Sequence, residues 1–342
     1  MINRPRPTTN RMPCSLTGNT MDSETSPSLI PNSSFSLRTP GLQLGLDSTS
    51  LGEFKQCPRK YQLSIVEGWQ EKGGKPDLEF GIWLHQAREE YEKITFAGAE
   101  HEEALQEVLG NLLKKTWDLE LDRPWTSTHP VKNRTTLVQT VIWYLDEVAQ
   151  GDHLETVRLA SGAPAVELSF RFDSGLRTRK GESILLCGHL DRIASFGEAH
   201  DFHNYVVDIK TTKSALNSRF FSSFSPDNQM SLYTIAGEVV FGVPIAGVII
   251  DGIQVGVGFA RFARAPIYRA PTLSDEWLGD LSYWLRLMEH CADAQHWPMN
   301  DKSCGMWGGC QFREVCGRSP GARDKWLKAN YTQRTWDPLL PR

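Results

Sequence analysis

The first half of the sequence places apolar residues at the spacing of helices. Between Leu78 and Phe96, apolar side chains recur every three or four residues and form a single stripe. Ser48 or Ser50 can cap an earlier helix, and the segment DRPWTSTHP separates two later ones. The pattern predicts helices over about 51–63, 78–96, 101–121 and 133–150.

The second half changes to the period of strands. Alternating and β-branched residues predict strands over 165–172, 184–194 and 204–212, and a strand region with a bend at its glycines over 243–262. Further helices are expected from Asp227 to about Phe241 and over 273–294. This order predicts an α/β fold, a small central mixed β-sheet flanked by helices, with an N-terminal helical subregion and a C-terminal cysteine clasp.

The domain organisation follows from the same pattern. Residues 1–42 are rich in Ser, Thr, Pro and Asn and lack periodicity, which predicts a disordered leader. Residues 43–320 predict one domain, and residues 321–342 a C-terminal tail. Within the domain we expect a helical part over 43–155, the sheet over 160–270, and the last helix with a cysteine cluster over 271–320.

The composition narrows the class of protein. The 342 residues are 40% hydrophobic and 23% charged, which is ordinary for a globular protein. No apolar run approaches the roughly 18 residues that span a bilayer, and the N-terminus lacks the apolar core of a secretory signal. We therefore expect a cytoplasmic protein without a membrane partner. The net charge of −4 argues against a broadly basic nucleic-acid coat protein, but it does not exclude a protein that contacts nucleic acid through one locally positive groove.

Two apolar runs that end in acidic residues carry the clearest chemical signal. Asp208 and Lys210 are two residues apart on a predicted strand, so their side chains point to the same face. Asp191 ends the preceding strand and can reach the same place across a hairpin. Two carboxylates beside one ammonium are costly in an apolar setting unless a cation lies between them, and oxygen ligands favour Mg²⁺ or Mn²⁺. The lysine could then orient or deprotonate a metal-bound water, as in phosphodiester hydrolysis.

The other candidate residues each have an ordinary interpretation as well. Glu167 lies on the first predicted strand, where a solvent-facing carboxylate is common. His85 lies on the second helix, where a lone histidine is usually structural. Gln229 and Tyr233 are four residues apart on one face of a helix, as in any amphipathic helix. It is the order of these residues along the chain that points to a shared site.

In this order the motifs resemble those of the PD-(D/E)XK nuclease superfamily, specifically its RecB-like exonuclease branch, over residues 46–318. The matching segments are Gly81–His85, Glu167, Gly188–Asp191, Asp208–Lys210 and Gln229–Tyr233. The resemblance implies a restriction-endonuclease-like fold, with metal ligands from His85, Asp191, Asp208 and the Ile209 carbonyl. It also implies that Lys210 positions the water, that Gln229 and Tyr233 hold DNA or support the site, and that Glu167 assists through a second metal or a water.

The cysteines suggest a second metal centre. Cys304, Cys310 and Cys316 lie in a Gly-rich segment, Cys57 lies far upstream, and seven cysteines without a secretory signal indicate metal or cluster ligands rather than disulfides. The segment around Cys57 is similar to one in RecB-like nucleases that hold a [4Fe–4S] cluster, and this resemblance implies the same four-cysteine clasp. The spacing of Cys304 and Cys310 departs from the C-x2-C of that branch. Structural Zn²⁺ and plain reduced thiols remain alternatives.

Together these features predict a metal-dependent DNA nuclease, an exonuclease that acts on single strands or duplex ends. The expected cofactors are Mg²⁺ or Mn²⁺ and the [4Fe–4S] cluster, and the expected partners are DNA and a helicase or recombination protein. Two alternatives stay open: a catalytically silent DNA-binding or helicase-partner module of the same fold, and a nuclease that acts on RNA. The complete set of Asp191, Asp208 and Lys210 argues against the silent module.

Overall fold

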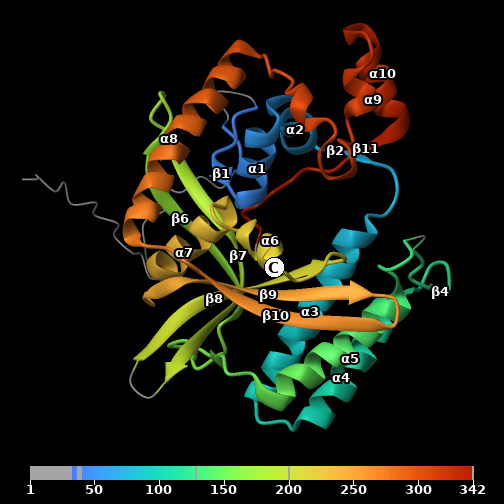
Figure 1. Cartoon of the computed structure of the whole chain (residues 1–342). Coiled ribbons are helices and arrows are strands. Elements are labelled where there is room, and N and C mark those ends of the chain that lie inside the picture. Colours follow the sequence, from blue (N-terminus) through green and yellow to red (C-terminus); the bar gives the residue numbers. More distant parts are fainter. Residues whose placement is uncertain (1–32, 37–40, 128, 199–200, 341–342) are drawn as a thin grey trace, which may run out of the picture.

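The computed structural model describes residues 33–36, 41–127, 129–198 and 201–340 (Figure 1). Most of the expected leader, residues 1–42, lies outside these residues. Its described end is attached to the fold, because Phe35 forms a bridge with Gln43 and Leu42 is 1% exposed. The folded part therefore begins within the segment for which disorder is predicted.

A mixed sheet runs through the centre of the protein. Its strands are β1 (Gly45–Leu46), β5 (Glu155–Thr156), β6 (Val166–Arg177), β7 (Ser183–Glu198), β8 (Asp201–Thr212), β9 (Ile245–Gly256) and β10 (Phe259–Tyr268). Along the order β1-β7-β8-β9-β10, β1/β7 and β8/β9 are parallel pairs and β7/β8 and β9/β10 are antiparallel pairs. Strands β5 and β6 pair with β7 in antiparallel fashion.

The strand β7 changes neighbours along its length. Its pairing with β8 ends at Arg192 opposite Val207. Beyond this point β8 stays paired with β9, up to Thr212 opposite Gln254. The two strands of the β7/β8 hairpin therefore separate directly after Arg192 and Val207, and this gap is where the predicted site residues lie.

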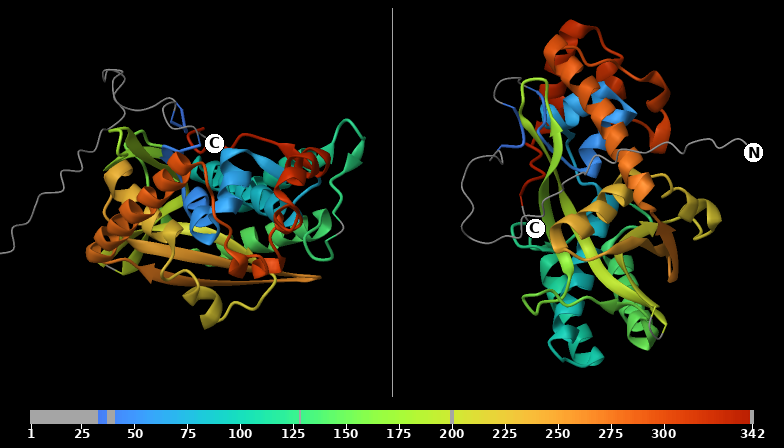
Figure 2. Two further views of the ribbon diagram at one scale, coloured as in Figure 1. Left: turned by 90° about the horizontal axis from the view of Figure 1, so that it is seen from above. Right: turned by 90° about the vertical axis from the view of Figure 1, so that its left-hand side faces the viewer.

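Helices cover both faces of the sheet. The main ones are α1 (Ser48–Gln56), α3 (Pro76–Phe96), α4 (His101–Lys115), α5 (Arg134–Gly151), α7 (Asn228–Phe241) and α8 (Pro271–Ala294). Figure 1 shows α3, α4 and α5 on one side and α1, α7 and α8 on the other, and the right-hand view of Figure 2 separates the same two groups. The first group packs on Ile209 and Ile253, and the second on Leu186 and Val206. This arrangement confirms the predicted fold class.

The first helical segment is broken where one helix is predicted. Helix α1 ends at Gln56, Cys57 is extended with φ −163° and ψ 113°, and α2 (Pro58–Tyr61) follows. A proline fits the first position of a helix because it has no N–H to donate, but it is not tolerated inside one. A π-helical turn, η1 (Gln62–Val66), continues the chain. The break places Cys57 at the corner between two helices.

Two small two-stranded sheets lie outside the main sheet. Helix α4 ends earlier than predicted, at Lys115, and β3 (Trp117–Asp118) pairs with β4 (Arg123–Pro124). Strand β2 (Trp69–Glu71) pairs with β11 (Tyr331–Gln333), so the C-terminal part returns to the N-terminal helices. The remaining short elements are α6 (Ser218–Ser222), η2 (Asp301–Ser303), η3 (Met306–Gly308), α9 (Arg313–Cys316) and α10 (Pro320–Asn330). The expected C-terminal tail thus contributes a helix and a strand to the fold.

None of the helices in the described part of the chain combines the length and apolar character needed to cross a membrane.

Candidate active site

Helix α3 brings His85 to the gap between β7 and β8. The buried side of this helix carries Phe80 and Leu84, and His85 lies at its edge with a side chain 22% exposed. His85 Nδ1 is 3.2 Å from Asp191 Oδ1, and Nε2 is 3.2 Å from the Ile209 carbonyl oxygen. Both ring nitrogens therefore face oxygen atoms, one from each strand of the hairpin.

Asp191 and Asp208 are the first residues past the last β7/β8 pair. Asp191 Oδ2 accepts a 2.9 Å hydrogen bond from the Ile209 N–H, so its side chain takes the place of a ladder bond. Asp208 is 1% exposed, and although Lys210 Nζ is 2.5 Å from its Oδ2, this oxygen accepts no hydrogen bond of acceptable angle. A buried carboxylate oxygen in this state is costly and is available to a cation.

Lys210 is held between β8 and the helix that follows. Its Nζ donates a 2.9 Å hydrogen bond to Gln229 Oε1, and Gln229 Nε2 donates to Tyr233 Oη at 2.8 Å. Gln229 and Tyr233 are one helical turn apart on α7, and the Asp227 side chain caps the first N–H groups of this helix. The helix thus fixes the amide group that orients the ammonium.

Glu167 has an unusual backbone conformation. Its φ of +45° lies in the left-handed region, which costs a residue with a Cβ about 1–2 kcal/mol. The residues on either side of it pair regularly with Arg192 and Leu190 of β7. Its carboxylate is 10% exposed and lies 3.9 Å from His85 Nδ1. Backbone strain at a single residue within a regular strand is typical of functional sites.

The negative charges of the site are not fully compensated by its own cations. Burial raises the pKa of Asp208 to about 6 in spite of the Lys210 ammonium. Burial also opposes the ionised form of Asp191, but His85 outweighs it and lowers the pKa of Asp191. Burial disfavours the imidazolium as well, yet Asp191 and Glu167 raise the pKa of His85. The carboxylates therefore compete for too little positive charge, and a bound divalent cation would remove this shortage.

The donor atoms fit a hard divalent cation. One atom each of His85, Glu167 and Asp191 lies within 4.8 Å of the other two, and the Ile209 carbonyl is in contact with the imidazole. The buried Asp208 carboxylate, which the Lys210 ammonium partly neutralises, adds a further oxygen beside Ile209. Carboxylate and carbonyl oxygens are the ligands that Mg²⁺ and Mn²⁺ prefer. The structure therefore brings together the residues that the sequence motifs single out as candidate ligands.

A family comparison decides what kind of site this is. Residues 48–317 match the sequence profile of the PD-(D/E)XK nuclease superfamily. The chain belongs to this superfamily. Membership makes it a phosphodiester hydrolase of a group that generally uses Mg²⁺ or Mn²⁺ and acts on nucleic acid. The acidic gap between β7 and β8 is the candidate active site of this nuclease.

Solved structures are similar to this nuclease only at low identity. A candidate exonuclease from Eubacterium rectale is 10% identical over 77% of this chain and 86% of that chain, with a TM-score of 0.45. The protein SSO0001 is 14% identical over 80% of this chain and 86% of that chain, with a TM-score of 0.31. No curated protein matches the sequence significantly. The superfamily assignment therefore depends on the family profile alone.

The cysteines of the predicted clasp come together although Cys57 is distant from the other three in sequence. The Asn300 N–H donates to Cys57 Sγ at 3.3 Å, and the Asn300 carbonyl lies 3.8 Å from Cys304 Sγ. The Cys304 carbonyl accepts the Cys310 N–H at 3.0 Å. Burial raises the pKa of the Cys310 and Cys316 thiols, and the nearby Cys57 acts in the same direction. Thiols in this setting ionise readily only if they bind a positive centre.

The cysteine sulfurs are more widely spread than a zinc site requires. With Zn–S bonds of about 2.3 Å, the thiolates of a tetrahedral site are about 3.8 Å apart. Within residues 33–36, 41–127, 129–198 and 201–340, the three candidate ligand atoms within 4.8 Å of one another belong to His85, Glu167 and Asp191, and no cysteines form such a group. Cys187 and Cys291 are buried elsewhere in the core, and Cys14 lies outside the described residues.

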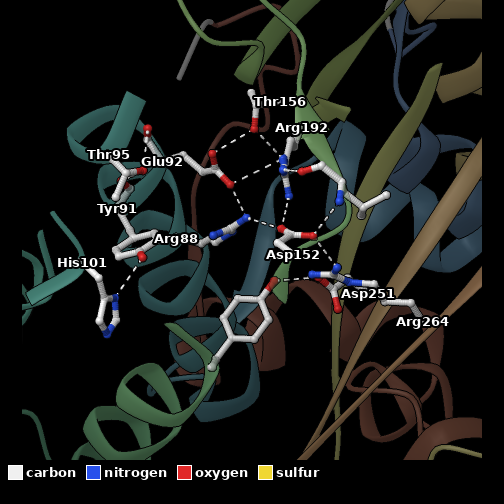
Figure 3. A network of polar contacts seen from close by, with 12 residues as sticks. Arg88, Tyr91, Glu92, Thr95, His101, Asp152, Thr156, Arg192, Asp251 and Arg264 are labelled. Atoms are coloured by element: carbon white, nitrogen blue, oxygen red, sulfur yellow. Dashed lines mark hydrogen bonds and ion pairs between the residues drawn. The ribbon is translucent and has the colours of Figure 1, made fainter. Parts of the chain in front are cut away.

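A buried network of ion pairs adjoins the active site of the nuclease (Figure 3). Asp152 lies 2.8 Å from Arg192, 2.6 Å from Arg264 and 3.2 Å from Arg88. Arg264 also lies 2.8 Å from Asp251. Burial raises the pKa of Asp152, but the arginines outweigh it and lower this pKa to about 2. The charges of this network therefore compensate one another, unlike those of the active site.

The network is connected to the candidate ligands through the chain. Arg88 lies three residues after His85 on α3, and Arg192 directly follows Asp191 on β7. Glu92 of α3 contacts both arginines, and residues of the network and of the site line the same small pocket. The motifs do not indicate this network. The signal that could have revealed it is a charged residue inside an apolar run, such as Asp251 in VIIDGI.

Proposed function

We propose that this nuclease is a metal-dependent exodeoxyribonuclease that carries a structural [4Fe–4S] cluster. The observation that carries the proposal is the separation of β7 and β8, around which His85, Glu167, Asp191 and the buried Asp208 gather beside an ordered lysine. This set of groups suits the attack of water on a phosphodiester with the help of a metal ion.

In this proposal His85, Asp191, Asp208 and the Ile209 carbonyl hold Mg²⁺ or Mn²⁺. When bound, such an ion polarises a phosphoryl oxygen and lowers the pKa of a coordinated water. The protein contributes by holding the ligands in position before the ion binds. The Ile209 N–H holds the Asp191 side chain, and helix α3 holds His85. Because the imidazole must be neutral to bind a cation, protonation of His85 and metal binding exclude each other.

Lys210 is proposed to face the water nucleophile. Burial disfavours its charge, but Asp208 and Asp191 outweigh this effect and raise the pKa of Lys210. The ammonium therefore stays protonated and orients the water by hydrogen bonding rather than by removing its proton. Gln229 fixes the ammonium and is itself fixed by Tyr233, while Glu167 stands next to His85 to assist through a water or a second metal.

The cysteines Cys57, Cys304, Cys310 and Cys316 are proposed to bind one iron each of the [4Fe–4S] cluster. The proposal is supported by the contacts through Asn300 and by the burial of the thiols. Such a cluster joins the corner after α1 to the segment after α8. A link between segments so distant in sequence restricts the unfolded chain and stabilises the fold.

Cleavage of end-labelled DNA tests the proposed activity. Anaerobically purified protein should shorten linear single-stranded or duplex DNA from an end when Mn²⁺ or Mg²⁺ is present, and EDTA should stop it. A circular single strand should resist, because it has no end. An Asp208→Asn protein purified in parallel controls for contaminating nuclease. Preference for an RNA strand of the same sequence would reassign the substrate, and binding of DNA without any cleavage would identify a silent DNA-binding module instead.

A further inference from the structure

Lys55 is a half-buried cation whose position is fixed from two sides. It lies in the last turn of α1. Its Nζ donates a 3.0 Å hydrogen bond to Asn228 Oδ1 and lies 5.2 Å from the ring centre of Trp284. These are its interactions within the part of the chain that the structure describes, and no carboxylate is among them. An ammonium held in place without a carboxylate retains its full charge for another anion.

Asn228 presents its amide nitrogen in a defined direction. Its Oδ1 accepts both the Lys55 Nζ hydrogen bond and a 3.1 Å hydrogen bond from Trp277 Nε1, so both acceptor sites of this oxygen are used. The amide cannot be turned around without losing both bonds. Among the described residues, none accepts a hydrogen bond from Asn228 Nδ2. Lys55 and Asn228 therefore form a small site that offers donors but no acceptor.

This donor-only site is directly connected to the candidate active site. Asn228 precedes Gln229, the residue that holds Lys210. Two consecutive amide side chains at the start of α7 thus hold two lysines, Lys55 from α1 and Lys210 from β8. The two lysines differ in one respect: Lys210 has a carboxylate partner in Asp208, whereas the acceptor that Lys55 contacts is neutral.

We propose that Lys55 Nζ and Asn228 Nδ2 bind a phosphate group of the substrate strand next to the phosphodiester that is cleaved. An anion with several acceptor oxygens matches a site made of an ammonium and an amide N–H group. Such a contact positions the strand and carries no sequence information. This inference rests on the proposed function. Both a terminal phosphate and an internal phosphodiester would satisfy the same chemistry.

The salt dependence of binding tests the charge contact. All measurements use the Asp208→Asn protein in Mg²⁺ with a fluorescent oligothymidylate, so that the strand stays intact. Lys55→Ala should weaken binding about tenfold and lower the slope of log affinity against log salt by about 0.7, the value for one single-strand phosphate contact. Lys55→Arg should keep the slope. Lys72→Ala is the matched control, because Lys72 is exposed and donates to the Ala329 carbonyl away from α7, and its slope should equal that of the parent.

Asn228→Asp is a second variant that preserves the packing. Its carboxylate can still accept from Lys55 and Trp277, but it neutralises Lys55 and replaces the amide donor with an anion. It should keep the unfolding midpoint of the parent protein and bind the strand more weakly than Lys55→Ala does. An unchanged slope in Lys55→Ala, together with unchanged affinity in Asn228→Asp, would overturn the proposed subsite while leaving the nuclease assignment intact. A parent protein that binds no nucleic acid would overturn the proposed function itself.

Neutral linkages identify which phosphate is bound. A series of oligonucleotides carries one methylphosphonate at successive positions, with or without a terminal phosphate. At the contacted position, neutralisation should weaken binding about tenfold in the parent and have little further effect in Lys55→Ala, because both changes remove the same ion contact. Coupling confined to the terminal phosphate would identify an end-recognition site, and coupling at one internal linkage a strand-positioning site. Additive effects at every position would contradict the proposal.

Discussion

Asp191 Oδ2 accepts the N–H of Ile209 at 2.9 Å, across a gap in which β7 and β8 no longer pair. The separation of the strands leaves backbone groups without ladder partners, and the Asp191 side chain satisfies one of them. The same separation lets the Ile209 carbonyl face His85 at 3.2 Å. The early end of the β7/β8 ladder thus makes the Asp191 carboxylate and the Ile209 carbonyl available at the same place.

Asp208→Asn should abolish activity and stabilise the metal-free protein. The loss of a ligand should slow cleavage at least about 1,000-fold, or about 4 kcal/mol in the barrier. The pKa of Asp208 is about 6 in the fold and about 3.9 in the unfolded chain, so its ionisation opposes folding increasingly as pH rises through this range. Denaturant unfolding in EDTA near neutral pH should show the variant to be more stable by about 1–3 kcal/mol.

Asp251→Asn is the matched control for the gain in stability that we expect of Asp208→Asn. Asp251 is also 1% exposed, but Arg264 and Tyr144 bind its carboxylate. Its neutral variant should therefore be less stable than the wild type. If Asp208→Asn lost stability to the same extent, the Lys210 ammonium alone would satisfy the Asp208 carboxylate, and the site would have no shortage of positive charge for a metal ion to remove.

His85→Ala should weaken metal binding and flatten its pH dependence. Because the pKa of His85 is raised, its imidazolium persists above pH about 6.5 and must lose its proton before the ring can bind a cation. The Mn²⁺ affinity of the wild type should decline as pH falls, starting above that value. Calorimetric titration with Mn²⁺ should show affinity at least about tenfold lower in the variant at high pH. His101→Ala, which changes a histidine paired with Asp146, should leave Mn²⁺ binding as it is.

At position 167 the glycine variant should be more stable than the alanine variant, which is the reverse of the usual order in a strand. In strands glycine is normally less stable than alanine by roughly 0.5–1 kcal/mol. At a φ of +45°, however, alanine keeps the steric strain and glycine removes it. Glu167→Gly should therefore be more stable than Glu167→Ala by about 1 kcal/mol in denaturant unfolding. The same pair of changes at Ser169, two residues along β6, should follow the normal order; a normal order at both positions would mean that Glu167 is not strained.

Local patterns predict the elements of this fold better than the places where they break. The segments that carry His85, Asp191 and Asp208 have clear helical or strand periods, because periodicity depends only on which side of an element is buried. The end of the β7/β8 ladder at Arg192 depends on how β1 and β8 divide one edge of β7 while β6 pairs along the other edge, and no local period records this division. The break at Cys57 is different, since Pro58 marks it in the sequence.

The ion-pair network illustrates a second limit of sequence patterns. Arg88 lies on α3, Asp152 follows α5, Arg192 lies on β7 and Arg264 lies on β10. Their proximity follows from the packing of α3 and α5 against the sheet. A contact between residues so far apart has no spacing rule, so only the folded structure reveals it.

Asp152→Ala should be among the most destabilising single changes in the protein. It leaves Arg88, Arg192 and Arg264 without their shared carboxylate, and breaking a buried ion pair in this way costs about 3–5 kcal/mol. Asp146→Ala, which removes a partly exposed carboxylate next to His101, should cost less than about 1 kcal/mol. Equal unfolding free energies of the two variants would show that the network contributes little to stability.

The stability of the wild type at acidic pH should depend on Asp152. The pKa of Asp152 is about 2 in the fold and about 3.9 in the unfolded chain, so its stabilising effect is complete above pH about 4 and is lost as pH falls toward 2. The difference in unfolding free energy between the wild type and Asp152→Asn should therefore shrink as the pH is lowered through this range. A difference that stays constant down to pH about 2 would contradict the lowered pKa.

Replacement of any clasp cysteine should remove iron without changing the metal dependence of the active site. Anaerobically purified wild type should be brown and carry about four irons per chain, since each of Cys57, Cys304, Cys310 and Cys316 would bind one iron of a cubane cluster. Serine variants should lose the colour and unfold more easily, because the link between distant segments is gone. Cys291→Ser, which replaces a buried cysteine outside the clasp, should keep both colour and iron.

The clasp variants that remain folded should require the same Mn²⁺ concentration for cleavage as the wild type, because the site between β7 and β8 shares no ligand with the cluster. One zinc and no iron per chain would mean that the clasp cysteines bind structural zinc and not an iron–sulfur cluster. If the protein held no metal at these cysteines, their contacts with Asn300 would have no role in metal binding.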